Sequence, residues 1–399
     1  MRRSMFVKAR DVSIASRLWL VAHEMCPPFA NQVILEGRGR LNVEEWIRAV
    51  KLASDANPGS RLVLRGHLGM SRWVDSGQTP PLRMIDAGDW DGCSSEGAPF
   101  LEKSFFPRRG PMAEVVLIQG DPLRVAFRSH HAVMDGRGTV FWAEEIFRVL
   151  RGESPLGSDT AITENALLNI SKQKLGTPIQ HNYIAPTGRA IGNEPGVIWK
   201  RTRISGRYPR LLIQIMLLTA REAWKHGSGP VRLGIPVDLR ARRKGLRSTG
   251  NLTNALFLEI TPDTTLESLD AELAFRLREQ RDGQLTWEDK IISHLPLSVL
   301  DMLLSKETRR SHRSGNYRFS GFVSNMGRFS MEGFSGGGFH ADMYWAVPVC
   351  MESVPFSLVL TGAGDFVDMI LAMPRALANQ QVLDETLGRI GSGLVTETR

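Results

Sequence analysis

Two adjacent histidines, His130 and His131, are the residues of this sequence best suited to move a proton. The segment 130–136 reads His-His-Ala-Val-Met-Asp-Gly, so three apolar residues separate the histidine pair from a carboxylate and a glycine. A stretch typical of a strand precedes the segment, and a stretch typical of a helix follows it. Because a neutral imidazole can accept a proton near pH 7, the segment predicts general-base chemistry.

Alternation along the preceding strand indicates which histidine faces the protein interior. Successive side chains of a strand point to opposite faces. Val125 and Phe127 then share a face with His131, whereas His130 falls on the face that carries arginines. We therefore expect His131 to project inward as the proton acceptor. His130 is expected to have a structural role, because only one of two neighbouring side chains can face the same space.

Asp135 lies four residues beyond His131, at a turn for which Gly136 supplies the flexibility. Two roles are open for its carboxylate: it can orient the histidine, or it can hold the turn through an arginine. An isolated His-His pair is more often a packed or surface pair than a catalytic one. The added aspartate and glycine, at a junction between strand and helix, favour the catalytic interpretation.

Hydrophobic periodicity and capping residues predict the elements that position this segment. Before it we expect helices over 11–25 and from Asn42 to the stop at 57–59, and strands over 31–37, 61–65, 72–74, 113–118 and 123–129. A helix over 139–150, capped by Thr139, follows it. Beyond it we expect strands over 197–204, 230–237, 254–260, 318–324, 339–346, 354–361 and 366–373, and helices over 209–225, 265–280, 290–305 and 378–392.

The chain is predicted to have an α/β fold built from two halves. Residues 152–196 are rich in Pro, Gly, Ser, Thr and Asn, and their apolar periodicity is weak. Structureless loops of that length commonly bridge domains. We therefore expect a first half at 1–160, a linker at 161–195 and a second half at 196–399. In the helix predicted over 11–25, Ile14, Leu18, Val21, Ala22 and Met25 repeat at helical spacing.

Composition excludes several classes of protein. The net charge is +8, from 50 Lys plus Arg against 42 Asp plus Glu, yet the longest basic run is Arg242-Arg243-Lys244, so no nucleic-acid partner is expected. Three widely spaced cysteines predict neither disulfides nor a zinc site, and the scattered histidines predict no metal. No apolar stretch approaches the roughly 20 residues of a membrane span. We expect a cytoplasmic monomer without a signal peptide.

The segment 130–136 resembles the motif of the HHxxxDG acyltransferase superfamily, and further matches follow along the chain. Pro236-Val237-Asp238-Leu239-Arg240, followed by Thr249-Gly250-Asn251, is similar to a second-half segment of freestanding members. The segment 323–328 resembles the one that such members place opposite the histidine. Asn57-Pro58-Gly59 and the segment 73–77 resemble parts of the first half. The resemblance covers nearly the whole chain, with the matches in the expected order.

This resemblance implies two chloramphenicol-acetyltransferase-like halves that form a pseudo-dimer around a central channel. It implies that His131 is the general base for transfer of an acyl group from a thioester to an alcohol or amine. Asp135 would pair with Arg240, and Ser324 and Asn325 would be the oxyanion candidates. His130 and Gly136 would support the site. No permanently bound cofactor is expected.

The resemblance leaves the substrates and one other function open. The donor could be acyl-coenzyme A or an acyl group on an acidic carrier protein, and the net positive charge suits either. The acceptor would be a small molecule. Arg137-Gly138 follows the motif, where condensation domains of peptide synthetases commonly have tryptophan, and this favours a freestanding acyltransferase of natural-product or lipid biosynthesis. The alternatives are a catalytically silent condensation-like module that binds carrier proteins, and a hydrolase with water as acceptor.

Overall fold

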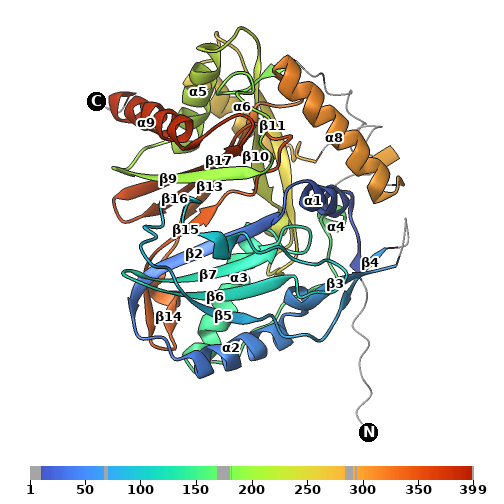
Figure 1. The fold of residues 1–399 in the computed structure, drawn as a ribbon, viewed down its shortest axis with the longest axis vertical. Helices are drawn as coiled ribbons and strands as arrows, with labels where there is room; N and C mark the ends of the chain where they lie inside the picture. Colours follow the sequence, from blue (N-terminus) through green and yellow to red (C-terminus); the bar gives the residue numbers. More distant parts are fainter. Residues whose placement is uncertain are drawn as a thin grey trace.

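Two six-stranded sheets form the framework of the protein (Figure 1). The computed structural model describes residues 10–66, 71–168, 180, 182–283, 291–292 and 294–397. One sheet has the strand order β14-β15-β2-β7-β6-β5, and the other has the order β11-β10-β13-β16-β17-β9. Helices accompany both sheets, so the predicted fold class, α/β in two halves, is confirmed.

The first sheet and its helices are built mostly from the N-terminal part of the chain. Asn42 caps α2 by accepting a hydrogen bond from the Glu45 N–H, as its position predicted. The elements are β1 (Arg10–Asp11), α1 (Ile14–Met25), β2 (Ala30–Gly39), α2 (Val43–Ala56), β3 (Leu62–Arg65), β4 (Arg72–Asp75), β5 (Leu82–Asp86), β6 (Ala113–Gln119), β7 (Leu123–His130) and α3 (Gly136–Leu150).

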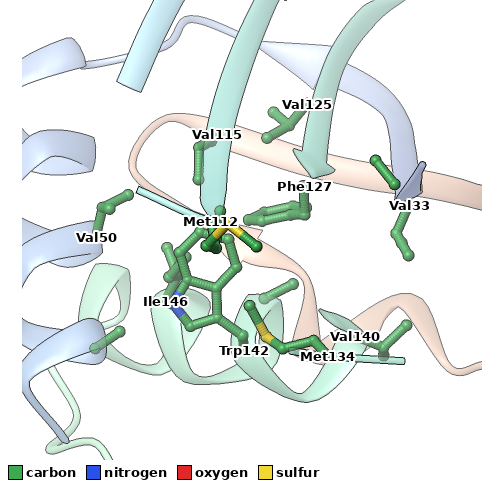
Figure 2. Close-up of a cluster of buried hydrophobic side chains, with 14 of the residues drawn as sticks. Val33, Val50, Met112, Val115, Val125, Phe127, Met134, Val140, Trp142 and Ile146 are labelled. Atoms are coloured by element: carbon green, nitrogen blue, oxygen red, sulfur yellow. The ribbon is translucent and has the colours of Figure 1, made fainter. Parts of the chain in front are cut away.

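The core of this half lies between the sheet and the helices α2 and α3. Figure 2 shows Val33, Val125 and Phe127 of the sheet facing Trp142 and Ile146 of α3. These five side chains are at most 2% exposed. Since burial of each such apolar side chain contributes about 1.5–3 kcal/mol, this core fixes the end of β7 against the start of α3. The histidine segment connects those two points.

The C-terminal part of the chain supplies the second sheet, the two-stranded sheet of β12 and β8, and the strands β14 and β15 of the first sheet. The elements are α4 (Glu164–Leu167), β8 (Tyr183–Ile184), β9 (Val197–Ser205), α5 (Leu211–Trp224), β10 (Val231–Asp238), β11 (Thr253–Ile260), α6 (Leu266–Arg278), α8 (Leu297–Ser314), β12 (Asn316–Tyr317), β13 (Gly321–Arg328), β14 (Ser335–Gly336), β15 (Phe339–Val347), β16 (Ser357–Ala363), β17 (Phe366–Pro374) and α9 (Gln380–Glu397). No helix in the described ranges has the length and apolar character needed to cross a membrane.

The late strand β15 leaves the second half and joins the first sheet. It pairs antiparallel with β2, from Phe339 opposite Gly39 to Val347 opposite Gln32. In Figure 1, the orange strand β14, which pairs with β15, accordingly lies in the lower part of the molecule with the N-terminal strands β5, β6 and β7. The segment 339–347 therefore belongs to the predicted second half by chain position and to the first sheet by pairing. The boundaries at 160 and 195 stay a prediction.

A buried ion network joins the two sheets. Arg201 of β9 donates to Glu36 of β2 at 2.9 Å and contacts Asp368 of β17 at 3.2 Å. Arg124 of β7 also contacts Glu36, at 2.9 Å. Since removal of one member of a buried pair leaves an uncompensated charge, loss of any of these residues should destabilise the contact between the two sheets.

Two predicted helix starts differ from the structure. The first helix, expected from residue 11 with Asp11 or Ser13 as its cap, begins at Ile14 with Ser13 as its cap, because Arg10 and Asp11 pair with β4. Thr139 lies inside α3, which begins at Gly136 with Asp135 as its cap. The helix expected over 290–305 overlaps α8, which runs from Leu297 to Ser314; residues 291–292 are helical, and residues 290 and 293 lie outside the described part of the chain, so the start of this helix stays a prediction.

Candidate active site

A cavity of about 1560 Å³ lies between the two halves. The first half contributes α1, β2 and the turn from β7 to α3, whereas the second contributes β10, β11, β13 and β16. Ile14 and Leu18 of α1 line this cavity. Val21 and Ala22 of the same helical repeat are buried, so α1 packs one part of its apolar face against the protein and turns another part toward the space between the halves.

Every backbone carbonyl of the turn from His131 to Asp135 accepts a hydrogen bond. The donors come from α1, β2, α3 and the segment before β11, so both halves hold the turn. Asn251 Nδ2 donates to the His131 carbonyl (2.8 Å), Ser16 Oγ to that of Ala132 (2.9 Å), the Asn251 N–H to that of Val133 (3.1 Å), Asn31 Nδ2 to that of Met134 (2.7 Å), and the Thr139 N–H to that of Asp135 (2.9 Å).

The imidazole of His131 is half-buried and lines the cavity. It packs against Trp19 and Phe29, with ring centroids 5.2 and 5.7 Å away, and these two rings also pack against each other at 5.4 Å. Its Nδ1 lies 3.3 Å from the Met134 carbonyl oxygen. Because a carbonyl only accepts, Nδ1 carries the proton, and Nε2 of the neutral ring keeps its lone pair. This is the tautomer that a general base requires.

The protonation state of His131 supports the same role. Burial lowers the pKa of His131, whereas the charge of Asp135 and the hydrogen bond to Met134 raise it; the net shift is downward from 6.5. The ring is therefore neutral at neutral pH. The strand alternation that predicted its direction does not apply, since β7 ends at His130 and the turn orients His131.

His130 is fully buried and faces away from the cavity. Its Nδ1 accepts a hydrogen bond from the Ala132 N–H at 3.0 Å, and its ring lies 4.6 Å from that of His23. Burial, with smaller contributions from the charges of His23 and His131, places the pKa of His130 well below 6.5. This neutral histidine closes the turn, in line with the structural role expected for it.

Asp135 joins the turn to the second half. Its two carboxylate oxygens each lie 3.0 Å from a guanidinium nitrogen of Arg240. They also accept hydrogen bonds from the Gly138 N–H (2.6 Å), the Leu252 N–H (2.7 Å) and Thr253 Oγ1 (2.9 Å). Burial favours the neutral acid, but Arg240 and these donors outweigh it and lower the pKa of Asp135. Of its two possible roles, Asp135 takes the one that holds the turn through an arginine.

The two glycines after Asp135 have different steric roles. A Cβ on Gly138 would lie 2.3 Å from the Thr249 carbonyl oxygen, so only glycine lets α3 pack against that backbone. A Cβ on Gly136 would reach Met326 at 3.7 Å, an ordinary contact. Gly136 is the first residue of α3 and lines the cavity. The expectation that the turn needs its flexibility was wrong, and Gly138 was not anticipated.

Ser324 and Asn325 lie on β13, in the opposite wall of the same cavity. Ser324 is half-buried and Asn325 is exposed. The Asn325 Oδ1 accepts a hydrogen bond from the Gly327 N–H at 3.0 Å, where the pairing of β13 with β16 shifts register. The structure thus brings both residues into the wall that faces the histidine turn, with part of the Asn325 amide used by a local bend.

Sequence reasoning missed several residues that position His131. Trp19 and Phe29 pack against its ring, and Asn31 holds the Met134 carbonyl to which the ring donates. A large aromatic residue beside the expected stripe of α1, and a polar residue within the apolar run of β2, were the available signals. The described residues contain no group of His, Cys, Asp and Glu side chains that could hold a metal ion.

Known protein structures share this architecture, although no family model and no curated protein matches the sequence. The first condensation domain of the calcium-dependent antibiotic synthetase, solved with a substrate analogue, superposes with a TM-score of 0.70 at 15% identity, covering 97% of this chain and 95% of that one. The chain has the condensation-domain fold. It surrounds the cavity and the histidine turn described above.

Two further similar structures have the same fold. The starter condensation domain of rhizomide synthetase RzmA, in complex with C8-CoA, has a TM-score of 0.68 at 16% identity and covers 98% of this chain and 95% of that one. The condensation domain from Monacolin K polyketide synthase MokA has a TM-score of 0.64 at 13% identity, with 98% of both chains covered. At these identities the similarity establishes the fold, and function must be argued from the site.

Proposed function

We propose that this protein is an acyltransferase that moves an acyl group from a thioester to an alcohol or amine, with His131 as the general base. The observation that carries this proposal is the hydrogen bond from His131 Nδ1 to the Met134 carbonyl. It leaves the Nε2 lone pair on a neutral ring in a cavity that both halves line. A base held in this way contributes about 10²–10⁴ in rate.

In the proposed reaction, the acceptor oxygen or nitrogen forms a bond to the acyl carbon while the carbon–sulfur bond breaks. The acceptor proton passes to His131 Nε2 and then to the leaving sulfur. Negative charge develops on the carbonyl oxygen in between and requires hydrogen-bond donors. Ser324 and Asn325 are proposed for this role, because they line the wall across the cavity from the turn. Asp135, Arg240, Gly136 and His130 support the geometry.

The donor is proposed to be acyl-coenzyme A or an acyl group on a carrier protein, with no permanently bound cofactor. Two similar structures support a thioester donor: RzmA starter domains were solved with C8-CoA, one of them also with Leu-SNAC. We place the protein among freestanding, cytoplasmic enzymes of natural-product or lipid biosynthesis that act on small acceptors. The alternative, a silent module that binds carrier proteins, would not require the proton-accepting tautomer of His131.

The test is consumption of thioester by the purified protein. Panels of acyl-coenzyme A and acyl-carrier donors are mixed with alcohol and amine acceptors, and products are identified by mass spectrometry. Ester or amide formation that depends on His131 supports the proposal. Thioester loss without an acylated acceptor indicates hydrolysis, and carrier binding without thioester loss indicates the silent module.

A further inference from the structure

Two buried histidines, one on α1 and one at the end of β7, lie side by side behind the histidine turn. The ring centres of His23 and His130 are 4.6 Å apart, and the rings are tilted by 57° to each other. Their side chains belong to residues that are 5% and 0% exposed, and neither lines the cavity. Burial is the main reason why the pKa of each residue is lowered. Each ring is therefore neutral at neutral pH and carries one proton.

The hydrogen bonds of the two rings fix which nitrogen carries that proton. The Ala132 N–H donates to His130 Nδ1 at 3.0 Å, so Nδ1 keeps its lone pair and Nε2 of His130 carries the proton. His23 Nε2 lies 2.9 Å from the Phe105 carbonyl oxygen. Because a carbonyl only accepts, Nε2 of His23 carries the proton and Nδ1 keeps the lone pair.

The remaining nitrogens of the two rings are complementary. His130 Nε2, a donor, and His23 Nδ1, an acceptor, are closed off from solvent and have no hydrogen-bond partner among the described residues. A buried polar group without a partner destabilises the folded protein, because it has lost its hydrogen bonds to water. Two rings with centres 4.6 Å apart can bring edge nitrogens to a hydrogen-bond distance of about 3 Å. Each ring therefore offers the group that the other lacks.

Helix α1 contacts the histidine turn through one of its faces. Ser16 Oγ donates to the Ala132 carbonyl at 2.9 Å, and the Trp19 ring packs against that of His131. His23 lies seven residues after Ser16, about two helical turns, and so falls on the same face. The Ala132 N–H belongs to the peptide bond that follows His131, so its direction affects how the His131 ring is aimed. A contact from His23 through His130 would let α1 hold both the N–H and the carbonyl of Ala132.

We propose that His130 Nε2 donates a hydrogen bond to His23 Nδ1, and that His23 is thereby a positioning residue for His131. The bond completes a chain from the Ala132 N–H to the Phe105 carbonyl, with the two rings between them. Because its three hydrogen bonds run in one direction, each polarises and strengthens the next. The chain also fixes His130 in the tautomer that accepts from Ala132. The positioning role rests on the proposed function, because it assumes that His131 is the base.

The first test detects the hydrogen bond in the wild-type protein by NMR, with isotope-labelled histidine nitrogens. We expect a scalar coupling between His130 Nε2 and His23 Nδ1 across the shared proton. We also expect nitrogen chemical shifts typical of a protonated Nε2 in both rings. A missing coupling, or a proton on Nδ1 of either ring, would overturn the inference. The measurement needs neither a variant nor a substrate.

Two variants of matched shape test the positioning role. Asparagine and leucine both branch at Cγ, but only asparagine can place an oxygen acceptor near the position of Nδ1. His23→Leu should lower kcat about three- to tenfold, the effect of one hydrogen bond, with little change in KM. His23→Asn should retain most of the wild-type kcat. Equal losses in the two variants, or no loss in His23→Leu, would contradict the positioning role.

The tautomer of His131 provides a readout that does not need turnover. In the wild-type protein, the nitrogen shifts of His131 should show the proton on Nδ1. They should move toward the average of the two tautomers in His23→Leu and stay near the wild-type values in His23→Asn. Unchanged shifts in His23→Leu would contradict the positioning role. If coupling and shifts are as expected but no thioester is consumed, the proposed function alone is contradicted. Turnover dependent on His131, without the coupling, would contradict this inference alone.

Discussion

The two walls of the cavity differ in how firmly their residues are held. In the wall of the first half, every carbonyl from His131 to Asp135 accepts a hydrogen bond from elsewhere in the protein. In the wall of the second half, β13 shifts register between Asn325 and Arg328, and both of these residues are exposed. The first wall is thus preorganised, whereas the second can adapt. We infer that the proton-accepting group lies in the rigid wall because its geometry must be maintained, while the facing wall accommodates substrate.

Loss of His131 should have the largest effect on activity. His131→Ala removes the proton acceptor, and the acyl-transfer rate should fall by about 10²–10⁴. The half-buried ring is not part of the core, so the variant should melt close to the wild-type temperature. His130→Ala is the matched control: it should lower stability more and chemistry less. Full activity in a well-folded His131→Ala protein would contradict the inference that the proton acceptor lies in the rigid wall.

Loss of the Asp135 carboxylate should loosen the rigid wall. Asp135→Ala removes the buried carboxylate that pairs with Arg240, which then keeps only the more exposed Asp238; loss of one member of a buried pair typically costs about 3–5 kcal/mol of unfolding free energy. Because the same carboxylate holds Leu252 and Thr253, activity should fall as well. Chemical denaturation measures the first effect and steady-state kinetics the second. Unchanged values for both would show that the wall does not depend on this ion pair.

Two alanine substitutions should distinguish a glycine needed for packing of the rigid wall from one that borders the cavity. Gly138→Ala places a Cβ against the Thr249 carbonyl and should lower the free energy of unfolding by about 1–3 kcal/mol. Gly136→Ala meets only Met326 at 3.7 Å, so its stability should change little. The added methyl group of Gly136→Ala projects into the cavity beside His131 and should raise KM. A lower melting temperature for Gly136→Ala than for Gly138→Ala would contradict these assignments.

Substitutions in the adaptable wall should have smaller effects. Ser324→Ala removes one proposed oxyanion donor, and kcat should fall about tenfold, the contribution of a single hydrogen bond to a charged group. Asn325→Ala should cost less, because the Asn325 oxygen is already used by Gly327. Steady-state kinetics with the same donor and acceptor for both variants tests this order. If either variant lost as much kcat as His131→Ala, both walls would contain residues whose fixed geometry is needed for catalysis.

The smallest expected effect is that of mild acid on the rate. The pKa of His131 lies below its ordinary value of 6.5, so more than half of the base stays neutral at pH 6.5, and most of the fall in kcat should come below that pH. The free energy of unfolding should respond over the same range of pH. His130 stays neutral when folded but protonates near pH 6.5 when unfolded, so unfolding free energy is lost as pH falls below 6.5. A kcat that already falls between pH 8 and 7 would contradict the shielded base.

Local patterns predicted most of the elements. The hairpin of β6 and β7, the capped start of α2 and the strands over 354–361 and 366–373 lie within a few residues of their predicted positions. Capping side chains and apolar alternation act over a few residues, so they can be recognised in a single sequence. The start of α3 was missed because Asp135 was considered for the site and not as a helix cap.

The sequence by itself determined the α/β class, the histidine segment and the Asp135–Arg240 pair, which the resemblance to a motif implied. Only the tertiary structure decided which way His131 points, since a turn held by Asn31 and Asn251 replaces strand alternation there. It also decided that β15 joins the first sheet, and that Gly138 is the glycine under the stricter steric constraint. The reason is physical: these features depend on contacts between segments tens to hundreds of residues apart, which leave no periodic signal in the chain.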